Sequence, residues 1–201
     1  MGCAASLNRA TLDRPAPRIG SSFDSPYHLL TFKSAKLLTH MATFDNLLQD
    51  GTIVRVKLRL PRGKFDEREL YAYPECLNWM RKTVPTMVTG RVQSAFTPAE
   101  QLINRLIQWI TGEPMVHDRM FKDMEPQRDG VWELKTADLR IFGWMYKPKK
   151  FIAVCGGYTD DYKEPTKIKN YADDKRAVMT ARNALPLDGE KFVMGDFDEL
   201  V

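Results

Sequence analysis

The sequence is poor in cysteine and has no long apolar run. Its longest uninterrupted apolar stretches are only a handful of residues, as at 151–155, whereas a bilayer-spanning helix needs roughly 20. We therefore expect no membrane-spanning helix. The three cysteines are too few and too scattered for a disulfide framework or a zinc knuckle, and their odd number favours a reducing compartment. These absences predict an intracellular protein of the cytoplasm.

The chain also lacks the sequence patterns of several enzyme classes. His28, His40 and His117 are isolated, with no second His or Cys at metal-ligand spacing. There is no Gly-x-Gly-x-x-Gly after a strand, no phosphate-binding P-loop and no Gly-x-Ser-x-Gly. We expect no metal ion and no cofactor. Cys155 ends an apolar run, where a cysteine usually serves as a small buried hydrophobe.

Charge is unevenly distributed along the chain, which carries 30 Lys and Arg against 26 Asp and Glu for a net charge of +4. Residues 1–64 are rich in Lys and Arg, whereas 186–201 are rich in Asp and Glu. The basic part is suited to phosphates, and the acidic part either repels nucleic acid or folds back over a basic groove. Simple solvation of both exposed ends is the competing explanation, and it is the commoner one.

The N-terminus fits the Met-Gly-x-x-x-Ser acceptor pattern for N-myristoylation, with Cys3 placed for a second, palmitoyl chain. A chance match to this loose pattern is the alternative, so we expect no membrane contact unless Gly2 is myristoylated. Residues 7–27 contain several Pro, Gly and Ser and show no apolar period, which is typical of an extended arm. We expect the arm to lie across another surface, either a neighbouring subunit or a larger assembly.

Apolar periodicity begins after this arm. Apolar residues at three- and four-residue spacing predict a helix over 34–49. Residues 53–60 then alternate apolar with basic, which is the period of a strand with one buried face. Arg55, Lys57 and Arg59 would share the other face. That face is either a solvated sheet edge or a track for phosphates.

Two helices, a run of short strands and a last helix follow. A short helix is expected at about 74–82 with loops on either side, and Thr97 with Glu100 forms a capping box that begins a helix over 97–111. The last helix is expected at 166–184. The strands are expected at 119–123, 130–137, 139–147 and 151–157. This order of elements predicts an α+β domain with an antiparallel sheet.

Several runs in the second half of the chain carry a resemblance to a known family. Leu-Ile at 106–107 precedes Gly112-x-Pro114, Phe-Lys-Asp-Met stands at 121–124, and 129–142 reads Asp-Gly-Val-Trp-Glu-Leu-Lys-Thr-Ala-Asp-Leu-Arg-Ile-Phe. Over about 96–182 the sequence resembles the RelE/HigB superfamily of toxin proteins, and within it the phage-derived HigB-like branch. The resemblance implies a RelE-like fold, in which helices pack on a curved antiparallel sheet.

The same resemblance implies a function. Members of the superfamily are endoribonucleases that cut messenger RNA, commonly on the ribosome, and need no metal ion or cofactor. The implied partners are RNA, the ribosome and a cognate antitoxin. The chain then divides into an extended arm at 1–33, a RelE/HigB-like α+β domain with an N-terminal helix at 34–185, and an acidic tail at 186–201.

Four positions correspond to catalytic positions of the family. Arg140 matches the strand arginine, whose guanidinium suits two phosphate oxygens; structural pairing with Glu133 is the alternative. Lys135 falls at the last position of the family's Trp-Glu-Leu-Arg motif. Lys169 and Tyr171 stand where some members place a catalytic Lys or Tyr. The other residues assigned to RNA binding are Arg55, Lys57, Arg59, Lys149, Lys150 and Lys163.

Asp160 and Asp161 depart from the family pattern, which usually has two consecutive basic residues after the fourth strand. A like charge near a scissile phosphate costs on the order of 1–4 kcal/mol. Two functions therefore stay open. One is a metal-independent endoribonuclease, and the other is a catalytically degenerate RelE-fold protein of phage or prophage origin that binds a protein assembly. The first is favoured if one concave face unites Lys135, Arg140, Lys150, Lys163 and Lys169.

Overall fold

The computed structural model describes residues 42–91 and 93–201. The myristoylation pattern at Gly2, the arm at 1–33 and the first part of the helix predicted over 34–49 lie outside the described residues. Within the described part, no helix combines the length and the apolar character that a membrane crossing needs.

A six-stranded open sheet forms the centre of the fold, with the strand order β1-β2-β6-β5-β4-β3. The strands are β1 (Val54–Arg55), β2 (Glu69–Ala72), β3 (Phe121–Asp123), β4 (Trp132–Lys135), β5 (Leu139–Lys147) and β6 (Lys150–Tyr158). Neighbours are antiparallel except β2 and β6, which run parallel from the Glu69–Lys150 pair to the Ala72–Ala153 pair. The predicted α+β class is confirmed. The prediction of a wholly antiparallel sheet is wrong at this one pair, because a helical crossover separates β2 from the meander that ends in β6.

The helices are short except for two. They are α1 (Phe44–Gln49), α2 (Pro74–Asn78), α3 (Pro98–Ile110), α4 (Tyr171–Ala184) and α5 (Phe197–Leu200). A π-helical turn at Trp79–Thr83 continues α2, and the 3-10 turns η3 (Gln127–Asp129) and η4 (Thr159–Tyr162) lie beside α4 in the fold. The predicted capping box is present: the Thr97 side chain accepts from the Glu100 backbone, and the Glu100 side chain accepts from the Thr97 backbone.

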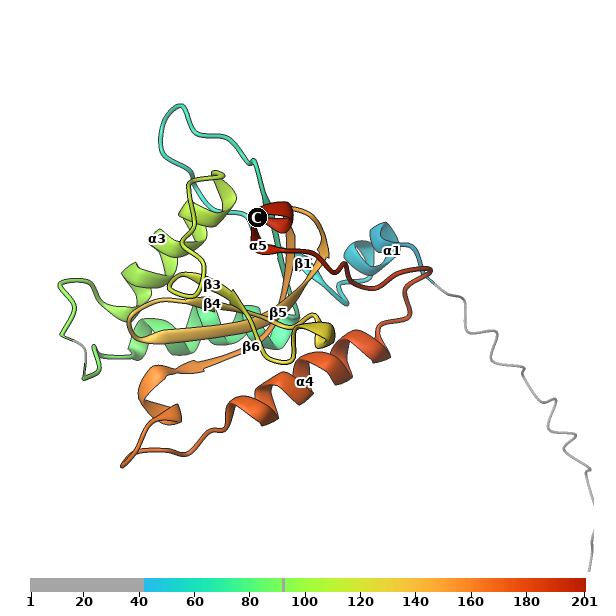
Figure 1. Ribbon diagram of the computed structural model, residues 1–201. Helices are drawn as coiled ribbons and strands as arrows, with labels where there is room; N and C mark the ends of the chain where they lie inside the picture. The colour runs from blue at the N-terminus through green and yellow to red at the C-terminus, as the bar shows by residue number, and fades with distance from the viewer. Residues whose placement is uncertain (1–41, 92) are drawn as a thin grey trace, which may run out of the picture. The chain divides into compact units, whose positions relative to one another are not determined.

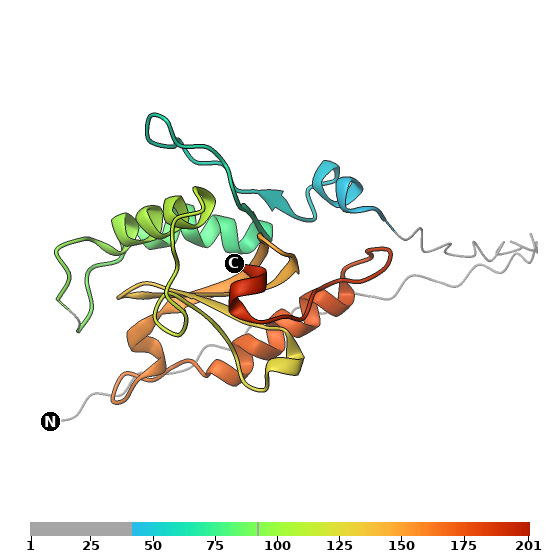
Figure 2. The same cartoon turned by 45° about the horizontal axis from the view of Figure 1, so that its top comes forward.

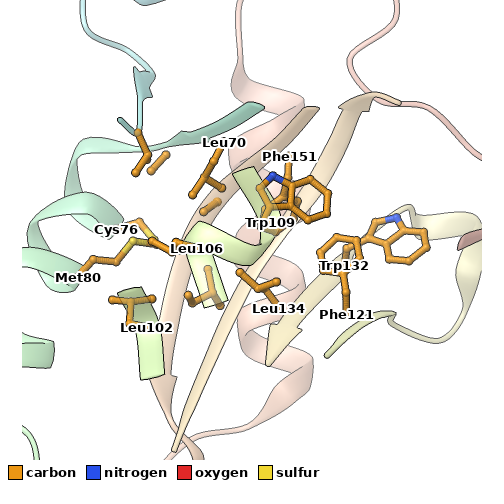
Figure 3. Close-up of a cluster of buried hydrophobic side chains, with 14 of the residues drawn as sticks. Leu70, Cys76, Met80, Leu102, Leu106, Trp109, Phe121, Trp132, Leu134 and Phe151 are labelled. Atoms are coloured by element: carbon orange, nitrogen blue, oxygen red, sulfur yellow. The ribbon is translucent and has the colours of Figure 1, made fainter. Parts of the chain in front are cut away.

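Both faces of the sheet are buried, so the domain has three layers. α2, α3 and α5 cover one face, where Trp109 of α3 packs against Phe121 and Phe151 (Figure 3). α1 and α4 cover the other face, where Phe142 and Trp144 of β5 share a second core with Val178 of α4 and Leu47 of α1. α3 and α4 lie on opposite sides of the sheet in both views (Figures 1 and 2).

The first predicted strand is shorter than its pattern. Only Val54–Arg55 pair as β1, and the backbone N–H of Val56 adds one bond to Leu70. Residues 57–60 have no strand partner. The segment that would pair with them contains Glu67 and Arg68, and the N–H groups of both bond instead to the carbonyl of Ile110, at the end of α3. The strand predicted over 53–60 is therefore wrong beyond Val56.

Other elements also differ from prediction. The strands predicted over 119–123 and 130–137 are shorter, as β3 and β4. Ala42 and Thr43 are not helical and Thr43 caps α1, so the predicted helix 34–49 is wrong at its centre. α4 begins at Tyr171, where the Asn170 side chain accepts from the Ala172 N–H, and not at residue 166. β2 was not predicted at all.

Candidate functional site

A cationic cluster lies on the α4 side of the sheet. Trp132 and Leu134 of β4 point into the core under α3, so strand alternation turns Glu133 and Lys135 to the opposite face. Arg140 stands directly across from Lys135, and Lys122 of β3 across from Glu133. Three cations therefore surround one carboxylate.

Glu133 and Arg140 form a buried ion pair. Arg140 Nε lies 3.0 Å from Glu133 Oε1, and the two side chains are only 11% and 4% exposed. Nη1 of Arg140 donates to the carbonyls of Thr136, at 2.6 Å, and Leu139, at 2.8 Å. Burial raises the pKa of Glu133, an effect that the neighbouring cations Arg140, Lys135 and Lys122 partly offset. Arg140 thus forms the ion pair with Glu133 that the sequence analysis gave as the alternative to phosphate binding.

Lys135 is half-buried beside this pair. Its ammonium donates to the carbonyl of Asp118 at 2.9 Å. Burial lowers the pKa of Lys135, and Arg140 and Lys122 lower it further, while Glu133 opposes them. An ammonium group with a lowered pKa releases its proton more easily than a solvated lysine does.

Lys169 joins the same face from the segment before α4. Its ammonium donates to the carbonyl of Gly156 at 2.8 Å. The next residue, Gly157, pairs with Arg140 across β5 and β6, and a Cβ at this position would lie 2.9 Å from Lys169 Nζ. Because Gly157 has no side chain, the ammonium of Lys169 fits beside it, on the strand next to the one that carries Arg140.

Tyr171, the fourth predicted catalytic residue, packs among aromatic rings and not among the charged groups. Its ring stacks on that of Tyr162, with centroids 4.5 Å apart, and meets Phe142 edge to face. Phe142 pairs with Glu133 across the ladder, so Tyr171 lies at the border of the cluster. The hydroxyl of Tyr162 donates to Asp174 at 2.8 Å, which fixes the ring pair to α4.

The residues assigned to RNA binding do not join this cluster. Lys150 lies 2.8 Å and Arg55 3.7 Å from the Glu69 carboxylate, at the other end of β6. Lys149 lies in the turn between β5 and β6, where its backbone N–H bonds to the carbonyl of Leu200. The exposed members of the set are Lys57, Arg59, Lys149 and Lys163. The structure thus unites Lys135, Arg140 and Lys169 and separates them from Lys150.

Asp160 and Asp161 have structural partners. The Asp160 carboxylate accepts from the Arg91 backbone at 3.1 Å, and the Arg91 guanidinium donates to the carbonyl of Glu164 at 2.6 Å. The carbonyl of Asp161 accepts from the N–H groups of Ile168 and Lys169. The two residues thereby hold the segment that carries Lys169.

Sequence reasoning did not assign Lys122 or give Glu133 a chemical role. The signal for Glu133 was available, because it alternates with Trp132 and Leu134 and so must share the face of Lys135. Lys122 needs the β3–β4 register, which the sequence alone does not provide.

Known proteins give no guide to this site: no protein-family model matches the chain, and neither does any curated protein or solved structure. Within residues 42–91 and 93–201, no three His, Cys, Asp or Glu side chains are grouped so that they could hold a metal ion.

Proposed function

We propose that this face binds the backbone of messenger RNA and that the chain is a metal-independent endoribonuclease of RelE/HigB-like type, with the ribosome as one setting. The observation that carries the proposal is the grouping of Lys122, Lys135 and Arg140 around the buried carboxylate of Glu133. The lowered pKa of the half-buried Lys135 suits this side chain to acid–base chemistry. The resemblance over 96–182, with its expected RelE-like fold, points to the same reaction.

The chemistry follows from what RNA offers. A ribose 2′-oxygen attacks the adjacent phosphorus, the bond from phosphorus to the 5′-oxygen breaks, and the products are a 2′,3′-cyclic phosphate and a 5′-hydroxyl. Lys135, whose pKa is lowered, accepts the proton of the 2′-hydroxyl in its neutral form, while the buried Glu133 holds Arg140 in position. The positive charge of Arg140 stabilises the phosphorane, and the ammonium of Lys169 protonates the leaving 5′-oxygen.

The test compares the wild-type chain with Lys135→Gln and Lys122→Gln, which leave the Glu133–Arg140 pair in place. We expect single-stranded RNA affinity to fall with salt, and each variant to lower the slope by about 0.7 per lost phosphate contact. On induction in a bacterial host, we expect Lys135→Gln to relieve toxicity and to remove the cleavage sites seen by primer extension.

One observation favours the alternative, a degenerate RelE-fold protein that binds an antitoxin or a phage protein assembly. The guanidinium of Arg140 already engages Glu133 and two backbone carbonyls, so much of its capacity for phosphate is used within the protein. Weak, salt-insensitive RNA binding in the wild type and both variants would overturn the nuclease proposal in favour of this one.

A further inference from the structure

The connection between β1 and β2 forms a projecting basic loop, residues 57–65. It extends away from the sheet and is drawn in teal in Figures 1 and 2. Leu58 and Leu60 pack against the core under α3, so the intervening Lys57 and Arg59 are exposed. Residues 57–60 thus alternate between half-buried and exposed side chains, as in a strand, although they pair with no other strand.

The tip of the basic loop is a tight turn. The N–H of Lys64 bonds to the carbonyl of Pro61 at 3.1 Å, and Gly63 takes a φ of +81°, a conformation that glycine adopts without strain. Arg62 is exposed within this turn, and Phe65, the residue that follows the turn, is 77% exposed.

Two ion pairs hold the loop in place. Arg55 lies 3.2 Å from Asp66 and joins the two chain segments at its base, and Lys64 in the tip lies 3.2 Å from Glu113, beyond the end of α3. Lys57, Arg59 and Arg62 have no salt-bridge partner in the part of the chain that the structure describes. The loop therefore presents three cations and one aromatic ring on a backbone that ion pairs hold at its base and at its tip.

We infer that the basic loop is a second binding site for single-stranded RNA, in which Arg59 and Arg62 contact phosphates and Phe65 stacks on a base. Cations interleaved with an exposed aromatic ring fit the two features that every unpaired nucleotide offers, a phosphate and a π-face. An anionic membrane is the less suitable partner, because Leu58 and Leu60 turn into the core and leave one apolar side chain for insertion.

This inference rests on the proposed function only in taking RNA as the partner. The loop joins the sheet beside the β5–β6 turn, since Glu69 N bonds to the carbonyl of Lys149. Arg140 lies at the other end of β5, roughly 24 Å from that turn at about 3.4 Å per residue, and the loop projects further still. A stacked strand that rises about 3.4 Å per nucleotide therefore needs at least about seven nucleotides to touch both sites. The loop should therefore strengthen the binding of long RNA in particular.

The experiment measures fluorescence anisotropy of the full chain with a labelled 20-nucleotide oligouridylate over a salt series. We expect Arg59→Gln/Arg62→Gln to reduce the slope of log affinity against log salt by about 1.4, for two lost contacts. Phe65→Leu keeps the apolar volume but removes the π-face, so we expect affinity to fall about 5- to 150-fold with the slope unchanged. The matched control is Arg81→Gln/Lys82→Gln, which removes the same charge from an exposed helical turn.

Several outcomes would overturn the inference. A control as weak as the loop variant would show only the effect of net charge, and unchanged binding by Phe65→Leu would exclude stacking. Binding of phosphatidylserine vesicles that Arg59→Gln/Arg62→Gln removes, with RNA binding independent of the loop, would assign the loop to membranes. Failure of the nuclease proposal is seen separately, as cleavage that Lys135→Gln does not affect while the loop variants still lose affinity.

Discussion

At the scale of single residues, the pair of Glu133 and Arg140 limits how the site can be probed. Removing one member of a buried ion pair leaves the other charge without compensation, at a cost of about 3–5 kcal/mol. If Arg140→Ala lost activity, the experiment would not distinguish the loss of a catalytic group from the loss of folding stability. Variants of Lys135 and Lys122 are better probes because these side chains are half-buried and lie outside the pair.

We predict that Arg140→Met lowers the free energy of unfolding by about 3–5 kcal/mol, because Glu133 stays buried without its partner. The double variant Arg140→Met/Glu133→Leu should recover most of that loss, since two apolar side chains of similar volume replace the pair. Urea denaturation of the wild type, the single variant and the double variant measures both effects. A double variant no more stable than Arg140→Met would contradict the prediction.

The cysteines of the core should be unreactive. Burial raises the pKa of the Cys76 thiol to about 12, and burial together with the nearby Asp174 raises that of Cys155 as well. Because only the thiolate is nucleophilic, we predict that a Cys3→Ser chain takes up almost no iodoacetamide at pH 8 when folded, and two equivalents in urea. Intact-protein mass spectrometry gives the count. Rapid labelling of the folded chain would show that either thiol reaches solvent.

At the scale of elements, α4 is tied to η3 by a short ion pair. Lys175 Nζ lies 2.7 Å from Asp129 Oδ2 and also donates to the carbonyl of Glu125. The hydrogen bond from Lys175 lowers the pKa of Asp129, burial opposes this effect, and the charges of Lys175, Arg128 and Arg182 lower the pKa further. A carboxyl group whose pKa is lowered by folding stabilises the fold above its unfolded pKa of about 3.9. This contribution disappears as the pH falls through the lowered value.

We predict that Lys175→Gln lowers the melting temperature at pH 7 and that the difference from the wild type becomes smaller in acid, below the lowered pKa of Asp129, where only the bond to the Glu125 carbonyl remains. Thermal denaturation over a pH series measures this difference. Arg176→Gln is the matched control, because the exposed pair of Arg176 and Asp173 should contribute little at any pH. A Lys175→Gln difference that is as large at the lowest pH as at pH 7 would show that Asp129 is not its cause.

Strands that pair with the next strand in the sequence were predicted well. β5 matches the predicted 139–147, and β6 extends the predicted 151–157 by one residue at each end, because a hairpin is encoded by its own alternation and turn. β2 was missed because Leu70, Tyr71 and Ala72 are all buried, so it shows no alternation. Its partner β6 is also distant in the sequence, which local patterns do not reveal.

The candidate site shows the same division. The sequence named Lys135 and Arg140 as candidates on neighbouring strands, and the β4–β5 register shows that they lie opposite each other. The hydrogen bond of Lys169 to Gly156 and the attachment of Asp160 to Arg91 depend on loops that fold together from distant parts of the chain. Sequence patterns carry no information on such contacts.

At the scale of the whole molecule, the acidic tail is partly a piece of the core. Leu200 of α5 is 2% exposed, its carbonyl accepts from Lys149, and Val193 bonds to the carbonyl of Met145 in β5. The acidic side chains Asp196, Asp198 and Glu199 remain exposed. The tail therefore covers the sheet with its apolar side and leaves its charge in solvent.

We predict that Leu200→Ala lowers the free energy of unfolding by about 2–5 kcal/mol, as for other buried leucines. The control Asp198→Asn, at an exposed position of the same helix, should change it by no more than about 0.5 kcal/mol. Denaturant titration measures both variants. A Leu200→Ala variant as stable as the wild type would mean that α5 is detached from the core in solution.

The parallel pairing of β2 with β6 has a consequence for biosynthesis. Glu69 emerges from the ribosome roughly 80 residues ahead of its partner Lys150, and β1 pairs with β2 over only two residues. Until β6 has been made, the nascent chain exposes an open strand edge and the apolar stripe of α3, which are the surfaces that chaperones protect and aggregates recruit. A chain that stops before residue 150 is thus a substrate for quality control and not a smaller version of the domain.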